Sequence, residues 1–548
     1  MAGSKKRVYC CCALMLLGLV AVIVCVAAYA GRKCPEGTFA KVAVAADSGK
    51  CSQIGRDMIR KGGSAVDGAI AALLCTSLIN PQSMGLGGGS IFTVTDSSGN
   101  VKIINSRETV PRHIKPDLLE SCPKTFQLIS GSQWIGVPGE IRGYEMAHKH
   151  YGKLPWAALF QPTIQLAREG FPIPEIQGRY IAYINTNQTK PLSKMSHNYE
   201  EDLYTDKNGN LMKTGDIVKF EKLADTLEKI ADQGAEAFYT GSIAEDLIRD
   251  IQEAGGTLTA QDLVSYRVTV TDAWVVPLGE YQMYIPPPPA GGVILSFVLN
   301  LLKEYKLDSK SLIGEEKNLL YHRLVEAFKF SNGLKKYIRD PGFSSEEHIQ
   351  SLISNSQTHD AHYYNVTPHL DSMGTTHVSV LAEDGSAVSV TSTINHIFGS
   401  KVMSPRTGVV LNNQLSDFCG REEHIFPGQQ PPSSMAPTVL KSNSKMLVIG
   451  STGGNMITAG MVSTLMNRLW LGKSLKEAIA APVVYVNGQN ILSFEPNFDE
   501  NVIKALAALG HTQKTISRFY NVVNAVERED GCICAVSDAR KLGEAAGY

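Results

Sequence analysis

The chain has 548 residues, and its 52 basic and 53 acidic side chains leave a net charge of −1. This balance provides no basic excess for binding nucleic acid and no acidic tail typical of a scaffold. The hydrophobic fraction of 43% is that of an ordinary globular protein. The length corresponds to roughly three or four domains of average size, so the motifs must indicate how the chain is organised.

An uncharged apolar segment occupies residues 8–30, directly after a basic cluster at residues 5–7. About 20 apolar residues span a bilayer, and this segment is longer than the apolar part of a typical signal peptide. Basic residues before a span favour a cytoplasmic N-terminus. We therefore predict a cytoplasmic tail at 1–7, a signal-anchor transmembrane helix at 8–30 and an extracellular remainder. The tripeptide at 28–30 resembles a cleavage site and leaves a secreted form open.

The part of the chain after this segment begins with strand and helix patterns. An apolar run at 40–46 predicts a short strand, and Ser64 can cap a helix over about 65–78 that carries an apolar stripe. A glycine-rich stretch at 85–90 resembles a phosphate-binding loop. It lacks the Gly-Lys-Ser/Thr ending of such loops, so we interpret it as a site of close backbone packing.

Two apolar runs, at 91–94 and 101–104, then predict a β-hairpin that ends shortly before Arg107. Further along, a proline- and glycine-rich run at 286–292 separates a predicted strand from a predicted helix at 294–302. Strands and helices that alternate in this way, with an antiparallel hairpin among them, indicate an α+β fold in which helices cover sheets.

The most informative part of the sequence consists of two segments that alternate between apolar and polar residues, at 375–380 and 388–393. This period of two is the pattern of β-strands, and the Glu-Asp-Gly loop at 383–385 suits a hairpin. The loop favours the register that gathers the apolar residues on one face. The apolar pairs that result are Val378 with Val390 and Val380 with Val388.

The opposite face of this predicted hairpin is polar. The same register pairs His377 with Thr391 and places Thr375 directly across from Thr393, at the open end of the hairpin. Because Thr is a good strand residue, the row of hydroxyls has a simple structural interpretation as a solvated sheet face.

A known family shares these motifs. The sequence Gly-Thr-Thr-His-Val-Ser at 374–379, followed by Thr-Ser-Thr-Ile-Asn at 391–395, resembles the gamma-glutamyltransferase family of N-terminal nucleophile hydrolases. Precursors in that family cut themselves before a Thr, which becomes the new N-terminus and the nucleophile. The resemblance implies a cut between Gly374 and Thr375, with Thr375 as the catalytic residue. A Thr hydroxyl needs a base to take its proton, and the freed α-amine of the same residue can be that base.

The resemblance also implies which residues form the substrate pocket. Arg107 would bind the α-carboxylate of a glutamyl group, because a guanidinium matches a carboxylate in shape and charge. Thr393 would hold the nucleophilic hydroxyl, and Gly453 and Gly454 would donate backbone N–H groups to the oxyanion. The remaining substrate-binding residues implied are Asn395, Gln414 and Asp417, for the α-amino and α-carboxylate groups, and Ser433 and Ser434, for the carboxylate.

Each pocket residue also has a structural interpretation. An Arg at a strand end usually makes a surface ion pair, Gln414 and Asp417 suit a loop with local hydrogen bonds, and the Ser and Gly pairs suit tight turns. Their occurrence together, in the order of the family, favours the pocket. Some family members carry Glu where this chain has Gln414, so Asp417 would have to supply the negative charge.

The resemblance implies more about the fold and the organisation of the chain than the strand and helix patterns do. The fold would be a four-layer αββα sandwich, with two stacked sheets between helical layers. A large subunit at 31–374 and a small catalytic subunit at 375–548 would arise from one zymogen and form an interwoven heterodimer. No metal and no other cofactor is implied.

Two further features would fit an extracellular protein. Cys51 and Cys75 flank a helical segment, and the resemblance implies a disulfide between them. Asn187 and Asn365 each begin an Asn-X-Thr sequon and would be glycosylated. The predicted location is the cell membrane, with a single-pass type II anchor.

The implied activity is cleavage of the γ-glutamyl bond of glutathione and its conjugates, with transfer to water or to amino acid or peptide acceptors. Segments at 81–86, 132–136 and 286–292 resemble the branch of the family that converts leukotriene C4 to D4. One alternative is an inactive surface protein that keeps the fold and acts as a receptor or binding module. Another is an uncleaved amidase of different specificity.

Overall fold

The computed structural model describes residues 34–123, 129–181, 203–344, 374–516 and 521–548. The predicted tail and signal-anchor helix at 1–30 lie outside these ranges, as do the sequons at Asn187 and Asn365. Among the described residues, no helix combines the length and the apolar character needed to cross a bilayer.

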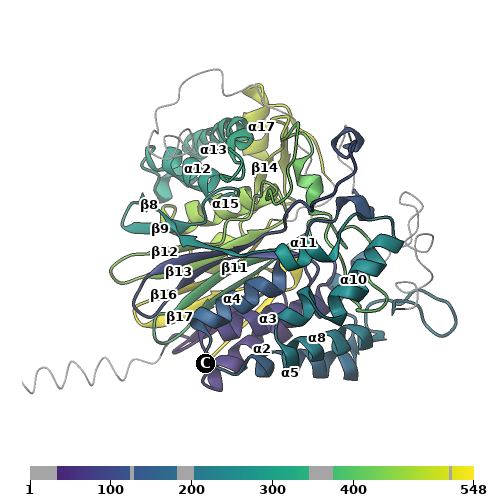
Figure 1. Ribbon diagram of the computed structural model, residues 1–548. Helices are drawn as coiled ribbons and strands as arrows, with labels where there is room; N and C mark the ends of the chain where they lie inside the picture. The colour runs from purple at the N-terminus through teal and green to yellow at the C-terminus, as the bar shows by residue number, and fades with distance from the viewer. Residues whose placement is uncertain (1–33, 124–128, 182–202, 345–373, 517–520) are drawn as a thin grey trace, which may run out of the picture.

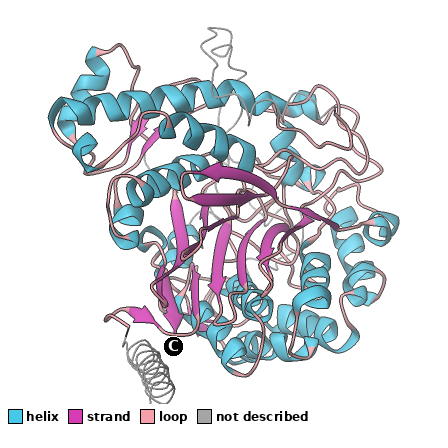
Figure 2. Ribbon diagram, turned by 90° about the vertical axis from the view of Figure 1, so that its left-hand side faces the viewer, coloured by secondary structure: helices cyan, strands magenta, loops and turns pink. Residues whose placement is uncertain are grey.

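The described residues form two seven-stranded antiparallel sheets that are stacked face to face at the centre of the molecule (Figures 1 and 2). Sheet I contains, in spatial order, β18 (Glu544–Gly547), β2 (Ala43–Ala46), β10 (Thr376–Leu381), β11 (Ala387–Thr393), β3 (Gly89–Thr95), β4 (Val101–Ser106) and β7 (Thr269–Asp272). Sheet II contains β1 (Thr38–Phe39), β17 (Cys532–Val536), β16 (Val522–Glu529), β13 (Met446–Thr452), β12 (Thr438–Lys441), β9 (Tyr281–Ile285) and β8 (Trp274–Leu278).

Helices cover the outer face of each sheet, which gives four layers in the order αββα (Figure 1). The layer next to sheet I contains α2 (Gly49–Arg60), α3 (Ala65–Ile79), α4 (Glu140–Tyr151), α5 (Trp156–Glu169) and α8 (Glu221–Gln233). The layer next to sheet II contains α12 (Gly292–Lys303), α13 (Gly314–Leu334), α15 (Met456–Leu469), α16 (Leu475–Ala480) and α17 (Glu500–Ala508). The α+β fold expected from the sequence is confirmed.

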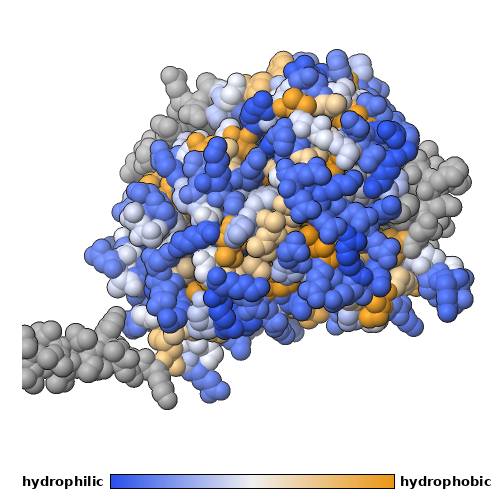
Figure 3. All heavy atoms as spheres, turned by 60° about the horizontal axis from the view of Figure 1, so that its bottom comes forward, coloured by the Kyte–Doolittle hydropathy of each residue, from blue (hydrophilic) through white to orange (hydrophobic). Residues whose placement is uncertain are grey.

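Smaller elements lie at the periphery of these layers. Helices α6 (Glu175–Ile181), α9 (Glu236–Tyr239), α10 (Ser242–Glu253) and α11 (Ala260–Ser265) extend the layer next to sheet I. Two small two-stranded sheets pair β5 (Phe171–Pro172) with β6 (Ile217–Val218) and β14 (Val484–Val486) with β15 (Leu492–Phe494). Helices α2, α5 and α8 come forward in Figure 3, where hydrophilic residues dominate the visible surface.

Helix α3 packs directly under the centre of sheet I. Ser64 and Asp67 form a capping box, in which the Ser64 hydroxyl accepts from the Asp67 amide at 3.1 Å and the Ser64 amide donates to the Asp67 carboxylate at 2.8 Å. Every residue of the helix is buried, because sheet I covers one side and α2 and α5 cover others. Cys51 and Cys75, the pair that the resemblance implies, form a disulfide between α2 and α3.

The hairpin of β10 and β11 has the register predicted from its sequence. Val378 pairs with Val390, Val380 with Val388, and His377 with Thr391. The valines point to α3 and belong to the main hydrophobic core. The strand pattern therefore contained enough information to orient both faces of the hairpin.

The interpretation of the polar face as solvated is wrong, because this face packs against sheet II. The Ser379 hydroxyl donates to the carbonyl oxygen of Asn524 at 3.1 Å, and the Ser389 hydroxyl donates to that of Ile449 at 2.9 Å. Both residues are fully buried. Hydroxyl groups can be buried between sheets here because carbonyl oxygens of the facing sheet satisfy them.

The segments before and after residue 374 share one sheet. Strand β10 pairs with β2, and β11 pairs with β3, so two strands from the second segment lie between strands of the first. Neither segment contains a complete sheet I, and a chain cut before Thr375 would retain this interwoven core.

His377 connects the two sheets through a tight contact. Its ring nitrogens lie 2.9 Å from the hydroxyls of Thr391 and Ser379. Complete burial lowers the pKa of His377 to about 3, so the ring is neutral. On the facing strand β13, a Cβ atom at Gly450 would lie 2.1 Å from Cε1 of this ring.

We expect Gly450→Ala to lower the free energy of unfolding by roughly 1–3 kcal/mol, because the added methyl group overpacks the contact between the sheets. Thermal or urea unfolding of the purified protein measures the change. The matched control is Gly85→Ala, since a Cβ atom at Gly85 meets no atom within 4 Å. Adding His377→Ala to Gly450→Ala should restore part of the loss. Equal losses in Gly450→Ala and the control would contradict this account of the contact.

Candidate active site

Thr375 lies at the open end of the hairpin, one residue before β10. Its Oγ1 is 3.1 Å from Oγ1 of Thr393, the last residue of β11. Both residues are buried. The contact follows from the strand pairing, because residues directly opposite one another in an antiparallel pair bring their side chains together.

The backbone at this point is strained and crowded. The φ angle is 155° at Gly374 and 99° at Thr375. A β-branched residue such as Thr is rarely found at positive φ, and such a conformation costs on the order of 1–3 kcal/mol. A Cβ atom at Gly374 would lie 2.1 Å from the carbonyl oxygen of Asn395, so the position has room only for Gly. The peptide bond before Thr375 is therefore held in an unfavourable geometry.

Two charged residues that the sequence analysis did not identify hold Thr375 from another side. Lys541 Nζ lies 2.6 Å from the Thr375 carbonyl oxygen and 2.6 Å from Asp47 Oδ2. Asp47 also accepts from the Thr376 hydroxyl at 2.6 Å and from Asn524 Nδ2 at 2.7 Å. A buried ion pair needs such additional hydrogen bonds to offset the cost of removing both charges from water. Here the same hydrogen bonds hold the start of β10 in place.

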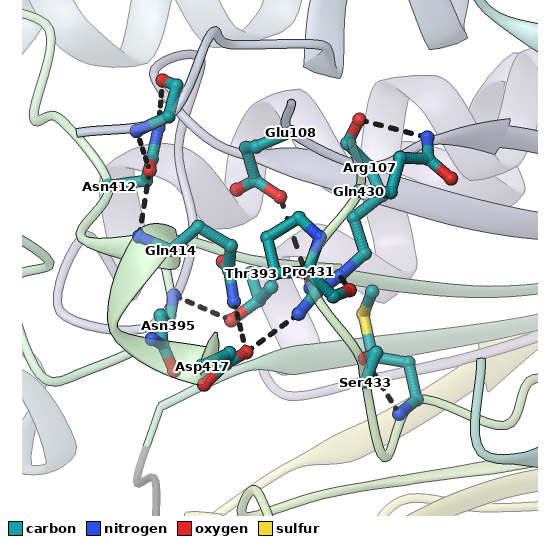
Figure 4. Close-up of polar contacts among 12 residues, drawn as sticks. Arg107, Glu108, Thr393, Asn395, Asn412, Gln414, Asp417, Gln430, Pro431 and Ser433 are labelled. Atoms are coloured by element: carbon teal, nitrogen blue, oxygen red, sulfur yellow. Dashed lines mark hydrogen bonds and ion pairs between the residues drawn. The ribbon is translucent and has the colours of Figure 1, made fainter. Parts of the chain in front are cut away.

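Asn395 connects the two hydroxyls to the next group of predicted residues. Its backbone N–H donates to Thr393 Oγ1 at 2.8 Å, and its Nδ2 donates to Ser416 Oγ at 2.9 Å. Ser416 belongs to the short 3-10 helix η7 (Gln414–Phe418), which carries two more of the predicted residues. Figure 4 shows this helix beside Thr393 and Asn395.

Arg107 follows β4 and is 1% exposed, so its interpretation as a surface ion pair is wrong. Its Nη2 lies 2.6 Å from Asp417 Oδ2 and 3.0 Å from the Pro432 carbonyl oxygen, and its Nε lies 2.9 Å from the Pro431 carbonyl oxygen (Figure 4). These bonds aim the guanidinium at η7. A buried cation of this kind is suited to bind a carboxylate.

Glu108, which the sequence analysis left without a role, lies next to this guanidinium. Arg107 Nη1 is 3.9 Å from Glu108 Oε2, and neither carboxyl oxygen has a hydrogen-bond partner among the described residues. Burial raises the pKa of Glu108 to about 8 although the nearby Arg107 opposes this shift. Glu108 is therefore mostly protonated at neutral pH and leaves the positive charge of Arg107 available.

Gln414 and Asp417 lie together on η7. Gln414 Nε2 donates to Asp417 Oδ2 at 2.7 Å, which is the same oxygen that Arg107 contacts. Gln414 Oε1 is buried and has no hydrogen-bond partner among the described residues. Since a buried acceptor without a donor is unfavourable, this oxygen is suited to receive an N–H group of a ligand.

The two serines lie along the segment that holds Arg107, but their hydroxyls have different neighbours. Ser433 Oγ accepts from the Met435 amide at 3.1 Å, whereas Ser434 Oγ lies 3.2 Å from Asn455 Oδ1. Ser434 is thus brought next to the Gly453-Gly454 turn rather than to the guanidinium.

Gly453 and Gly454 form the turn between β13 and α15. Their φ angles are 109° and 57°, and helix α15 begins at Met456. The N-terminus of a helix carries partial positive charge. A turn of this kind can stabilise a negative charge that develops beside it.

The site contains two threonine hydroxyls in contact, a buried cation and a carboxylate. The structure links Thr375 to Thr393 and Asn395, and it links Arg107 to Asp417 and Gln414. These are the parts that an acyl transfer reaction needs.

Comparison with known proteins agrees with this chemistry. The family model of gamma-glutamyltranspeptidase matches residues 51–548. The chain is 43% identical to "Glutathione hydrolase 5 proenzyme" of Rattus norvegicus over an alignment of 582 residues that covers 100% of both chains. It is also 43% identical to the protein of the same name from Homo sapiens, with 94% of each chain covered.

A solved structure supports the fold independently. Cephalosporin acylase from Bacillus halodurans superposes with a TM-score of 0.81 at 24% identity, covering 94% of this chain and 98% of the other. At that identity the likeness concerns the fold alone. The family model and the relatives lead to one conclusion: the chain belongs to the gamma-glutamyltranspeptidase family, whose members are enzymes that cleave γ-glutamyl bonds.

Proposed function

We propose that this chain cleaves the γ-glutamyl bond of glutathione and glutathione conjugates through an ester on Thr375. The observation that carries the proposal is the contact of the Thr375 and Thr393 hydroxyls, together with the ion pair of buried Arg107 and partly exposed Asp417. The names of the full-length relatives, which are glutathione hydrolases, support the choice of substrate.

The reaction has two steps. The Thr375 hydroxyl attacks the γ-carbonyl carbon while the α-amine of Thr375 takes its proton, and the N–H groups of Gly453 and Gly454 stabilise the oxyanion. The intermediate collapses, the C–N bond breaks, and the departing amine receives the proton. Water, or the amine of an amino acid or dipeptide acceptor, then attacks the ester and releases the γ-glutamyl group.

Recognition of the glutamyl end uses an exchange of ionic partners. A free α-carboxylate would pair with Arg107, and the neighbouring α-ammonium would pair with Asp417 and with the unpartnered Gln414 Oε1. The Arg107–Asp417 bond then opens into two bonds to the substrate. Asn395, Ser433 and Ser434 complete this end of the pocket in the proposal. An ordinary peptide lacks both charges at this distance from the reacting carbonyl.

The α-amine that acts as base exists only after a cut between Gly374 and Thr375, since the Thr375 nitrogen is otherwise an amide. We propose that the chain makes this cut itself. The Thr375 hydroxyl attacks the Gly374 carbonyl, the peptide C–N bond breaks to give an ester, and water hydrolyses the ester. The positive φ angles at both residues support this step, because the cut relieves their strain. The products would be subunits 31–374 and 375–548, with 1–30 attached to the first.

The proposed location is the cell surface, with the catalytic part outside and the segment at 8–30 as a type II anchor. Three disulfides support an oxidising compartment, because cytosolic proteins seldom form them. They join Cys34 to Cys532, Cys51 to Cys75 and Cys122 to Cys419. Glycosylation at Asn187 and Asn365 belongs to the same proposal.

Self-cleavage predicts two bands on a reducing gel, and the smaller band should begin Thr-Thr-His-Val-Ser when its N-terminus is sequenced. Thr375→Ala should give one uncut chain without activity, because it removes the hydroxyl that makes both attacks. Thr271→Ala, which alters an exposed Thr on β7, is the matched control and should still be cut. A single uncut chain in the unaltered protein would favour the alternative, an inactive receptor or binding module.

Arg107→Ala should raise KM for glutathione by roughly 10–100-fold, because a charge-assisted hydrogen bond contributes about 1.5–3 kcal/mol. Arg107→Lys keeps the charge without the planar fork and should recover only part of the affinity. Steady-state kinetics on fully cut protein measures both. The control is Arg112→Ala, which alters an exposed Arg nearby. An unchanged KM in Arg107→Ala would remove this residue from the pocket.

The narrower proposal is that the chain hydrolyses leukotriene C4 to D4. It is supported by the segments at 81–86, 132–136 and 286–292. Purified protein incubated with leukotriene C4 should yield leukotriene D4 and glutamate, as followed by chromatography. Cleavage of glutathione combined with failure on leukotriene C4 and other S-substituted glutathiones would reject this narrower activity and leave the broader one standing.

A further inference from the structure

Three potential metal ligands gather in the helical layer over sheet II. His322 and Glu326 lie one turn apart on α13, and His511 follows α17, the helix beside α13 in Figure 1. One ligand atom from each residue lies within 4.8 Å of the other two. Residues four apart on a helix project from the same face, so the sequence of α13 directs both of its side chains to His511.

The hydrogen bonds of this cluster define the protons on both rings. Lys329 Nζ lies 2.7 Å from His511 Nδ1. A charged Lys can only donate, so His511 Nδ1 is an acceptor and the proton of the neutral ring is on Nε2. That N–H donates to His322 Nδ1 at 2.9 Å. Each ring therefore keeps one unprotonated nitrogen, which is Nδ1 in both cases: that of His322 faces His511, and that of His511 faces Lys329.

The carboxylate completes the set of ligands. Glu326 Oε1 is 3.8 Å from His511 Nδ1 and 3.3 Å from Lys329 Nζ. The His511 side chain is 3% exposed and that of Glu326 is 27% exposed, which leaves the cluster enclosed yet reachable from solvent. The Lys329 ammonium group thus already contacts both the Glu326 carboxylate and the His511 ring.

We propose that His322, Glu326 and His511 bind a divalent transition-metal ion such as Zn²⁺. Two imidazoles and a carboxylate are a ligand set that Zn²⁺ accepts, with a water in the fourth position. The ion would replace the hydrogen between the rings. With Zn–N bonds of about 2.0–2.1 Å, the two nitrogens must separate from 2.9 Å to about 3.3 Å, which requires only a small movement of the side chains.

Lys329 competes with the ion in this proposal. When the metal binds His511 Nε2, the ring proton moves to Nδ1, which can no longer accept from the ammonium group. Lys329 then turns to solvent on its flexible side chain, and the Nδ1–H donates to water. Removal of the ammonium group should therefore strengthen metal binding, although Lys329 is not a ligand.

The position of the cluster suggests what the ion would do. His322 and Glu326 precede the junction at Gly374–Thr375, whereas His511 follows it. In a chain cut at this junction, the metal would connect the two fragments outside the strand pairing of sheet I. Binding of an ion to the assembled form alone stabilises that form.

Titration of the purified full chain with ZnCl2 after removal of metal by EDTA tests the proposal. Calorimetry should detect one strongly bound ion per chain, and Co²⁺ should give the visible absorption of a tetrahedral site. His322→Ala and Glu326→Gln should each weaken binding by at least about tenfold. Lys329→Met should strengthen it by a similar factor. His150→Ala removes an exposed His elsewhere and should have no effect.

Two results would overturn the proposal. One is Zn²⁺ affinity in His322→Ala equal to that in His150→Ala, which would place the ion elsewhere on the chain. The other is unchanged or weaker binding in Lys329→Met, which would leave the cluster as a hydrogen-bonded chain closed by Lys329. These tests replace His322 and Lys329, which are only half-buried. The conclusion therefore does not depend on whether the fold tolerates a substitution of buried His511.

Discussion

The hydrogen-bonded ladder between β10 and β11 is the constraint on which the rest of the structure depends. Side chains of a strand alternate between its faces, so one register places four valines toward α3 and the hydroxyls of Ser379 and Ser389 toward sheet II. A shift by one residue would bury hydroxyls under the helix and remove Thr375 from Thr393. The position of a single reactive hydroxyl is therefore determined by the packing of an entire sheet.

Electrostatics in the pocket depend on which carboxyl group stays charged. Glu108 is fully buried and mostly protonated, whereas Asp417 is 18% exposed and contacts Arg107 directly. The charge of Arg107 is thus balanced from the side that faces the pocket. A ligand that carries both an ammonium and a carboxylate can replace this contact without leaving either protein charge buried and unpaired, which would be strongly unfavourable.

Local patterns were sufficient to predict the elements whose signal lies in neighbouring residues. The capped helix after Ser64 and the register of the 375–393 hairpin are confirmed. The family, and with it the enzyme class, followed from the motif around Thr375 and is confirmed by the comparisons. Solvation of the polar face was predicted wrongly, since a strand pattern does not reveal whether a second sheet covers it.

Other features depend on contacts between distant parts of the chain. Lys541 and Asp47 are separated by almost the entire sequence, and a Lys near a C-terminus is normally exposed. No local pattern marks either residue for burial beside Thr375. The roles assigned to the site residues stay predictions, from Thr375 and Arg107 to Ser433, Ser434, Gly453 and Gly454.

The ion pair of Lys541 and Asp47 also has a consequence for a chain divided before Thr375. Asp47 would belong to the fragment before the cut, whereas Lys541 would belong to the fragment that begins with Thr375. Without Asp47, the buried ammonium group of Lys541 would lose its counter-ion, which is strongly unfavourable. The two fragments would therefore have to stay together for the start of β10 to keep its position.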